Sequence, residues 1–223
     1  MSAVLGERAD TAGLRRAVAG LYAITHEDPD TGRLTRKAEA ALAGGAGLLQ
    51  YRNKSGDSAL RRDQARALLA LCRRAGALLI VNDDIELALA VGADGVHLGR
   101  EDGDIAAARA RLGPQRLLGV SCYDRLDLAD AAVAAGADHV AFGSVFASPT
   151  KPGAVRAPLE LFTRARARLA VPIVAIGGIT AENAGAVIAA GADAVAVISA
   201  VFDADDIMAA AAAFHDLFRS KQS

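Results

Sequence analysis

Short apolar runs alternate with amphipathic segments along nearly the whole chain. The runs are rich in Val, Ile and Leu and contain few charged residues. Continuous apolar runs of this length predict strands that are buried on both faces, as in a parallel sheet covered by helices. We therefore expect strands at eight places: Gly20–Thr25, Leu48–Asn53, Leu78–Asp83, Gly95–Gly99, Leu117–Ser121, His139–Val145, Pro172–Gly178 and Ala194–Ser199.

The segments between these runs have the periodicity of helices. Between residues 60 and 73 the apolar side chains fall on one side of a helix and the arginines on the other. The apolar set is Leu60, Ala65, Leu68, Leu69 and Cys72, and the basic set is Arg61, Arg62, Arg66 and Arg73. Strands that alternate with helices of this length indicate repeated βα units.

A short motif, Gly-Ala-Asp-x-Val, occurs at Gly92–Val96, Gly136–Val140 and Gly191–Val195. At each place a helix is expected to end and a strand to begin. Glycine suits the position just past a helix end because it adopts the left-handed conformation without steric cost. The unequal spacing of the three copies argues against a solenoid, which keeps a fixed period.

Eight βα units in a chain of 223 residues match a compact (β/α)8 TIM barrel. The main alternative, an open doubly wound sheet, lacks the expected G-x-G-x-x-G after its first strand. We predict an α/β fold with one TIM-barrel catalytic domain over residues 19–219. Residues 1–18 are expected to form an N-terminal extension with a short helix at Thr11–Ala19.

Charge and composition exclude several classes of protein. The formal net charge is −1 and the isoelectric point is about 6.4, which disfavours binding of nucleic acid through a general positive field. The N-terminal residues lack the apolar core of a secretory signal, and no apolar stretch has the ~20 residues that span a membrane. Cys72 and Cys122 form neither a disulfide framework nor a metal knuckle. We expect a cytoplasmic protein without membrane or nucleic-acid partners, for which a homo-oligomer is possible.

The second strand ends in a polar sequence. Gln50, Arg52 and Lys54 are spaced two residues apart, so in an extended chain their side chains face the same way. An amide followed by two cations suits an elongated polyanion, such as a diphosphate attached to a polar ring. A salt-bridged polar layer inside the barrel would use the same residues, and the spacing alone does not separate the two interpretations.

Carboxylates follow the next two strands. Asp83 ends the third strand and Asp102 follows the fourth, so both can face one point above the barrel. Two carboxylates beside a phosphate-rich ligand are a usual way to hold Mg²⁺. Asp84 is instead expected to cap a helix at Ile85–Val91, and His97 is expected to be a core residue or a support of the site.

The remaining strand ends carry hydroxyls, a lysine and glycines. Ser121 lies at the end of the fifth strand, and the loop after the sixth contains Ser148, Thr150 and Lys151. Lys54 and Lys151 are two of only four lysines in the chain. The seventh and eighth strands end at Gly177-Gly178 and Ile198-Ser199, where TIM barrels commonly bind a phosphate through backbone N–H groups.

Taken together, these strand ends resemble the thiamine phosphate synthase family over nearly the whole barrel. The motifs that carry the resemblance are Gln50-Tyr51-Arg52-Asn53-Lys54, Asn82-Asp83, Gly95-Val96-His97-Leu98-Gly99-x-x-Asp102 and Ser148-Pro149-Thr150-Lys151. The resemblance implies the joining of 4-amino-5-hydroxymethyl-2-methylpyrimidine diphosphate to 4-methyl-5-(2-phosphoethyl)thiazole, with release of pyrophosphate. It also implies a dissociative reaction through a carbocation at the exocyclic CH₂, which needs no nucleophilic side chain.

The resemblance also assigns residues to roles. It implies that the pyrimidine diphosphate binds to Gln50, Arg52, Lys54, Asn82, Ser121 and Lys151, of which Arg52, Lys54, Ser121 and Lys151 would be catalytic. It places Mg²⁺ on Asp83 and Asp102, and the thiazole phosphate on Ser148, Thr150, Gly178, Ile198 and Ser199.

Two positions depart from the family pattern. Thr is frequent in the family where this chain has Ser148, which retains the hydroxyl, and Gln is common where it has Arg100. Arg100 is expected to point away from the metal or to meet Glu101 or an outer phosphate oxygen. The alternatives are a thiazole tautomerase-like isomerase on the same barrel and a non-catalytic phosphate-ligand-binding barrel. Neither needs both a diphosphate clamp and a metal pair.

Overall fold

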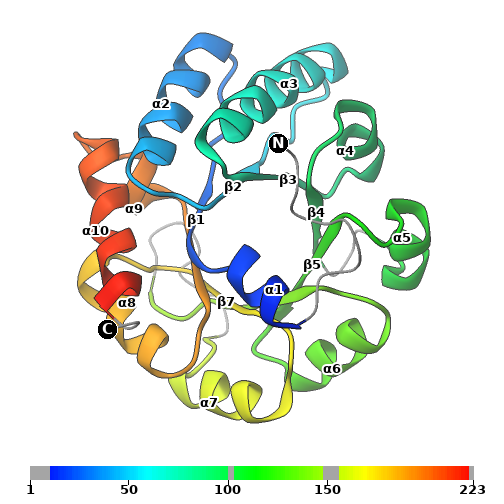
Figure 1. Cartoon of the computed structure of the whole chain (residues 1–223), viewed down its shortest axis with the longest axis vertical. Coiled ribbons are helices and arrows are strands. Elements are labelled where there is room, and N and C mark those ends of the chain that lie inside the picture. The colour runs from blue at the N-terminus through cyan, green and yellow to red at the C-terminus, as the bar shows by residue number, and fades with distance from the viewer. Residues whose placement is uncertain (1–10, 100–102, 148–155, 221–223) are drawn as a thin grey trace.

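The computed structural model describes residues 11–99, 103–147 and 156–220. Within them, eight strands run parallel and close into one barrel in the order in which they occur along the chain (Figure 1). The strands are β1 Gly20–Ile24, β2 Leu48–Tyr51, β3 Leu78–Asn82, β4 Gly95–Leu98, β5 Leu117–Tyr123, β6 His139–Phe142, β7 Ile173–Ile176 and β8 Ala194–Val197. The predicted α/β fold, a (β/α)8 TIM barrel, is confirmed.

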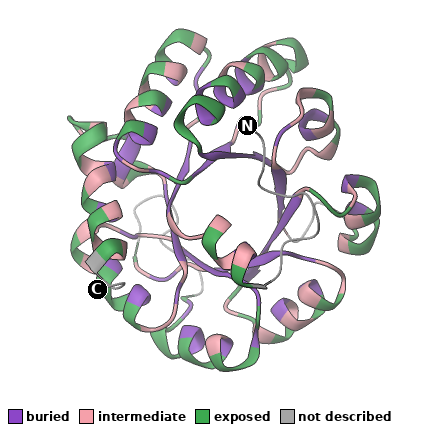
Figure 2. Cartoon of the chain, viewed as in Figure 1, coloured by how far each residue is buried: buried purple, intermediate pink, exposed green. Residues whose placement is uncertain are grey.

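Helices form the outer layer around this ring of strands (Figure 1). They are α1 Thr11–Ala17, α2 Thr31–Ala43, α3 Ser58–Ala75, α4 Ile85–Val91, α5 Ile105–Leu112, α6 Leu126–Ala134, α7 Leu159–Arg168, α8 Ala181–Ala189, α9 Ser199–Phe202 and α10 Ile207–Ser220. Figure 2 shows that the strands are buried almost throughout, while the helices are buried on their inner side and exposed on their outer side. None of the helices in the described ranges is long and apolar enough to cross a membrane.

The predicted elements agree with the structure in position more closely than in length. The helix Ile85–Val91 has the predicted bounds, and the Asp84 side chain caps it by accepting a hydrogen bond from the Leu87 N–H. Cys72 is fully buried on the inner side of α3, as its position in the apolar set predicted. Most strands end one to three residues before the predicted ends, whereas β5 continues to Tyr123. Most of the polar residues at the strand ends therefore lie beyond the strands, above the barrel, whereas Gln50, Asn82 and Ser121 lie within them.

The helix α1 is an exception to the outer layer, because it lies across the centre of the ring in Figure 1. It ends at Ala17, two residues before the predicted end. Leu14 and Val18 are buried in the same apolar cluster as Leu48, Leu78 and other residues that begin strands. The segment therefore closes the amino-terminal end of the barrel and leaves the carboxyl ends of the strands for a site.

The aspartate of the Gly-Ala-Asp-x-Val motif has the same structural role in all three copies. Each carboxylate accepts a hydrogen bond from the backbone N–H near the start of the preceding strand. The pairs are Leu79 N–H to Asp94 at 2.8 Å, Leu118 N–H to Asp138 at 2.8 Å and Ile173 N–H to Asp193 at 2.7 Å. The motif thus links neighbouring strands at the end of the barrel opposite the predicted site.

Candidate active site

The end of β2 is organised by the alternation of its side chains. Tyr51 and Asn53 point outward to α3, where both bond to Gln64. Alternation then places Gln50, Arg52 and Lys54 on the inner side of the barrel. Gln50 does point inward, because its Nε2 donates to the Oη of Tyr22 on β1 at 3.0 Å. Burial raises the pKa of Tyr22, so this phenol stays protonated beneath the site.

The backbone of the same segment is held by the loop after β1. The Arg52 N–H donates to Thr25 Oγ1 at 3.0 Å, and the Lys54 N–H donates to the Glu27 carboxylate at 3.1 Å. The Arg52 side chain is half-buried and that of Lys54 is exposed. The backbone is therefore fixed at both Arg52 and Lys54, and these two cationic residues lie at the rim of the barrel.

The end of β3 brings a carboxylate to these cations. Asp83 Oδ2 lies 3.5 Å from Lys54 Nζ and accepts a 2.6 Å hydrogen bond from Asn82 Nδ2. Asp83 has a φ of 63°, a left-handed conformation that is uncommon for a residue with a side chain. Such conformations cluster at functional sites, where the surrounding structure holds them. The structure thus brings together Lys54, Asn82 and Asp83, three of the predicted site residues.

The floor of the site contains two histidines and a serine. His97 on β4 places its Nε2 2.9 Å from Ser121 Oγ on β5, so it supports the predicted hydroxyl. His139 lies behind it, with its ring centroid 5.8 Å from that of His97. Burial, and secondarily His97, lowers the pKa of His139 to about 3, so its imidazole is neutral. A Cβ on Gly119 would lie 2.1 Å from His139 Nε2, so only glycine leaves room for both rings.

The turn after β7 is formed by Gly177 and Gly178, which both have positive φ. A Cβ on Gly178 would lie 2.6 Å from the Ala147 carbonyl oxygen, so glycine is required there on steric as well as conformational grounds. Asn183 on α8 bridges the turn: it accepts from the Thr180 N–H and donates to the Gly178 carbonyl, each at 2.9 Å. Hydrogen bonds to the Asn183 side chain thus hold the backbone of the predicted phosphate site in place.

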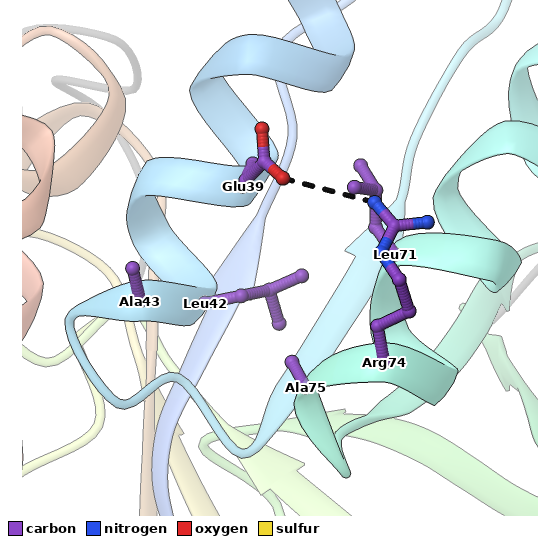
Figure 3. A pocket seen from close by; sticks show the side chains of 6 residues that line it. All are labelled: Glu39, Leu42, Ala43, Leu71, Arg74 and Ala75. Carbon is purple, nitrogen blue, oxygen red and sulfur yellow. Dashed lines mark ion pairs between the residues drawn. The ribbon is translucent and has the colours of Figure 1, made fainter.

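A surface hollow of about 300 Å³ lies elsewhere, between α2 and α3 (Figure 3). Apolar side chains and the Glu39–Arg74 ion pair, at 3.7 Å, line it. Ala43 and Ala75 are the last residues of their helices, so the hollow faces the amino-terminal end of the barrel. It is therefore separate from the strand ends that carry the predicted site residues.

Comparison with known proteins identifies the family. A model of the thiamine monophosphate synthase family matches residues 21–201. This chain belongs to that family. It is 62% identical over 199 residues to a thiamine-phosphate synthase of Aromatoleum aromaticum, covering 89% of this chain and 96% of the relative. It is 58% identical over 208 residues to that of Thiobacillus denitrificans, covering 93% of this chain and 99% of the relative.

Solved structures agree with this assignment to the thiamine monophosphate synthase family. The chain resembles a thiamine phosphate pyrophosphorylase from Pyrococcus furiosus with a TM-score of 0.83 and 36% identity, covering 93% of this chain and 99% of the other. An orotidine 5'-phosphate decarboxylase from Pyrococcus horikoshii shares the fold alone, with a TM-score of 0.65 and 16% identity over 88% of this chain and 99% of the other. The predicted resemblance to the family is confirmed.

Several predicted site residues of this family member lie outside the described residues: Arg100, Asp102, Ser148, Thr150 and Lys151. In the part of the chain that the structure describes, no three His, Cys, Asp or Glu side chains are grouped as a metal site. Asp83 is thus the predicted metal ligand that the structure describes. Of the thiazole phosphate residues, Gly178 and Ile198 are half-buried and Ser199 is exposed at the start of α9.

The residues that hold this site from behind were not predicted from the sequence. Tyr22, Thr25 and Asn183 bond to predicted site residues or their backbone, and Gln64 bonds to two residues that alternate with site residues along the end of β2. For Gln64 a signal existed, because an amide stands on the apolar side of the α3 pattern, next to Ala65. Polar residues that are buried in this way are generally hydrogen-bonded to something specific.

Proposed function

We propose that this member of the thiamine monophosphate synthase family joins the pyrimidine diphosphate to the thiazole phosphate named above, forming thiamine phosphate and pyrophosphate. The observation that carries the proposal is the arrangement at β2 and β3, where Lys54 Nζ lies 3.5 Å from the Asp83 carboxylate and Arg52 stands two residues before Lys54 on a backbone held by Thr25. Cations with an adjacent carboxylate suit a diphosphate that binds together with a divalent metal ion. The names of the relatives add support.

In this proposal Arg52, Lys54 and Lys151 bind the diphosphate, and the Ser121 hydroxyl, supported by His97, donates to it. Gln50 and Asn82 bind the pyrimidine end. Ser148, Thr150, Gly178, Ile198 and Ser199 bind the phosphate of the thiazole, with the backbone at Gly178 held by Asn183.

Magnesium is the metal that we propose for this site. The Asp83 carboxylate fits it, because Mg²⁺ prefers oxygen ligands and commonly takes one or two carboxylates together with phosphate oxygens. Asp83 is half-buried at the rim, and its Oδ2 is already directed toward Lys54, one of the cations proposed to bind the same diphosphate. Asp102 is the proposed second ligand. When bound, the ion would neutralise charge on the departing pyrophosphate.

The proposed reaction is a dissociative substitution. The bond between the exocyclic CH₂ and the diphosphate oxygen breaks, with both electrons leaving on pyrophosphate, and the thiazole nitrogen then donates its lone pair to the CH₂ carbon. The protein's part is to stabilise the leaving charge and to hold the two substrates in line. Burial raises the pKa of the nearby Cys122 thiol to about 12, which disfavours covalent catalysis by a thiolate.

The test is an assay of the purified protein with both substrates, with added Mg²⁺ or with excess EDTA. We expect thiamine phosphate and pyrophosphate in equal amounts, and only in the presence of the metal. Folded protein that forms neither product would overturn the proposed activity, and equal rates in EDTA would overturn the metal requirement alone. A cytoplasmic location, predicted from the sequence, stays a prediction.

A further inference from the structure

Gln64 is a fully buried amide on the inner side of α3. Its Oε1 accepts from Tyr51 Oη at 2.8 Å and from Asn53 Nδ2 at 3.1 Å. Its Nε2 donates to the Asp28 carbonyl oxygen at 2.7 Å. One side chain thus connects α3 to the end of β2 and to the loop after β1.

The two residues that Gln64 holds in β2 alternate with the two cations. Tyr51 precedes Arg52, and Asn53 stands between Arg52 and Lys54. Burial raises the pKa of Tyr51 to about 12, so its phenol keeps the proton that it donates to Gln64. Because successive side chains of an extended segment point to opposite sides, holding Tyr51 and Asn53 outward fixes the positions from which the cations point inward.

The loop after β1 completes this arrangement. The Asp28 carbonyl that accepts from Gln64 belongs to the same loop as Glu27, which receives the Lys54 N–H. Burying the Gln64 amide without these hydrogen bonds would cost free energy. An apolar side chain at position 64 would fill the same space but would not link the end of β2 to the loop after β1.

We propose that Gln64 is a positioning residue that pre-organises the Arg52–Lys54 segment for the diphosphate. This inference rests on the proposed function, since it assigns the segment to the pyrimidine diphosphate. Arg and Lys are long side chains with many rotamers, so a fixed backbone lowers the entropy that binding must overcome. Gln64 touches no substrate in this proposal, and its effect passes through Tyr51, Asn53 and Asp28.

The test is Gln64→Met, which keeps the length of the side chain and removes its hydrogen bonds. We expect KM for the pyrimidine diphosphate to rise on the order of tenfold, with KM for the thiazole phosphate changing less than about twofold. The matched variant is Asn183→Ala, an amide that bridges the other phosphate site. It should show the reverse pattern, raising KM for the thiazole phosphate.

The selectivity of the effect separates positioning from a merely structural role. A loss of folded protein lowers the apparent kcat for both variants but leaves each KM unchanged. If Gln64→Met folds and neither KM changes, or both rise equally, the inference is wrong.

If Gln64→Met does not fold, Tyr51→Phe removes one of the bonds, and an unchanged KM for the pyrimidine diphosphate in that variant overturns the inference. The wild-type assay decides the proposed function separately, because an inactive wild type contradicts the function and not the geometry.

Discussion

Lys54 Nζ lies 3.5 Å from Asp83 Oδ2, across the ends of the neighbouring strands β2 and β3. Both side chains are partly exposed, so the pair contributes little to the stability of the fold. Its significance lies in the charges that it places together. A diphosphate would attract Lys54 more strongly than Asp83 does, and a divalent metal ion would attract Asp83 more strongly than Lys54 does. Both side chains can therefore exchange their mutual contact for contacts with two ligands that bind together.

Asp83→Ala should therefore reduce turnover by at least about a hundredfold at saturating substrates, because the variant loses an anchor for the metal that neutralises the leaving group. The apparent Mg²⁺ concentration for half-maximal rate should also rise. Steady-state assays over a series of Mg²⁺ concentrations measure both effects.

The neighbouring carboxylate provides the control for this variant. Asp84 caps α4 and pairs with Arg61. Asp84→Asn keeps the capping ability and should retain turnover within about threefold, since Asn caps helices as well as Asp does. Near wild-type turnover in Asp83→Ala, or an equal loss in both variants, would contradict the role of Asp83.

The barrel could be predicted from the sequence because its signal is local and repeated. Each buried strand is a short apolar run, and each run is followed by a helix with one apolar side. The strand ends were less predictable, since they depend on hydrogen bonds that polar residues make outside the sheet. At the end of β2, for example, the Arg52 N–H bonds to the Thr25 side chain rather than to a neighbouring strand.

The site was predictable only where the pattern along a single strand determines it. The inward direction of Gln50 follows from the two-residue period of β2. The contact between His97 and Ser121 depends on the register between β4 and β5, and that between Gln64 and Asp28 depends on the rotation of α3 against a loop. Neither quantity is encoded in a local pattern, so these supporting contacts required the structure.

His139 should make the stability of the protein dependent on pH. Its pKa is about 3 in the folded state, against 6.5 as its ordinary value, so below pH 6.5 the unfolded chain binds a proton that the folded chain does not. The free energy of unfolding therefore falls with decreasing pH, by about 2 kcal/mol between pH 7.5 and pH 5 from this residue. Urea unfolding of the wild type and His139→Phe at several pH values measures the difference.

This difference should appear only where the imidazole of the unfolded chain titrates. Between pH 7.5 and pH 9 His139 is neutral in both states, so the wild type and the variant should change in parallel. Equal losses of stability between pH 7.5 and pH 5 would show that His139 is protonated in the folded barrel.

Asp138 should be important for stability and not for catalysis. Its buried carboxylate accepts from the Leu118 N–H and pairs with Arg109 at the end of the barrel opposite the site. Asp138→Ala leaves a largely buried guanidinium without its partner and should lower the free energy of unfolding by about 3 kcal/mol. The exposed pair Arg125–Asp127 provides the control, because Asp127→Ala should leave the free energy of unfolding nearly unchanged. Urea unfolding measures both variants, and KM values that change in folded Asp138→Ala would contradict a purely structural role.

The thiols should be inert in the folded protein. Cys72 and Cys122 are fully buried, and burial raises the pKa of each to about 12. At pH 8 such a pKa leaves about one thiol in 10⁴ as the reactive thiolate. We expect no reaction with DTNB within minutes in the native state and reaction of both cysteines in 6 M guanidinium.

Cys122 follows Ser121 at the end of β5, so treatment with iodoacetamide at pH 8 also tests the proposed mechanism. Turnover should survive the treatment, whereas rapid inactivation that pyrophosphate prevents would indicate a reactive thiolate in the site and contradict a reaction without a protein nucleophile.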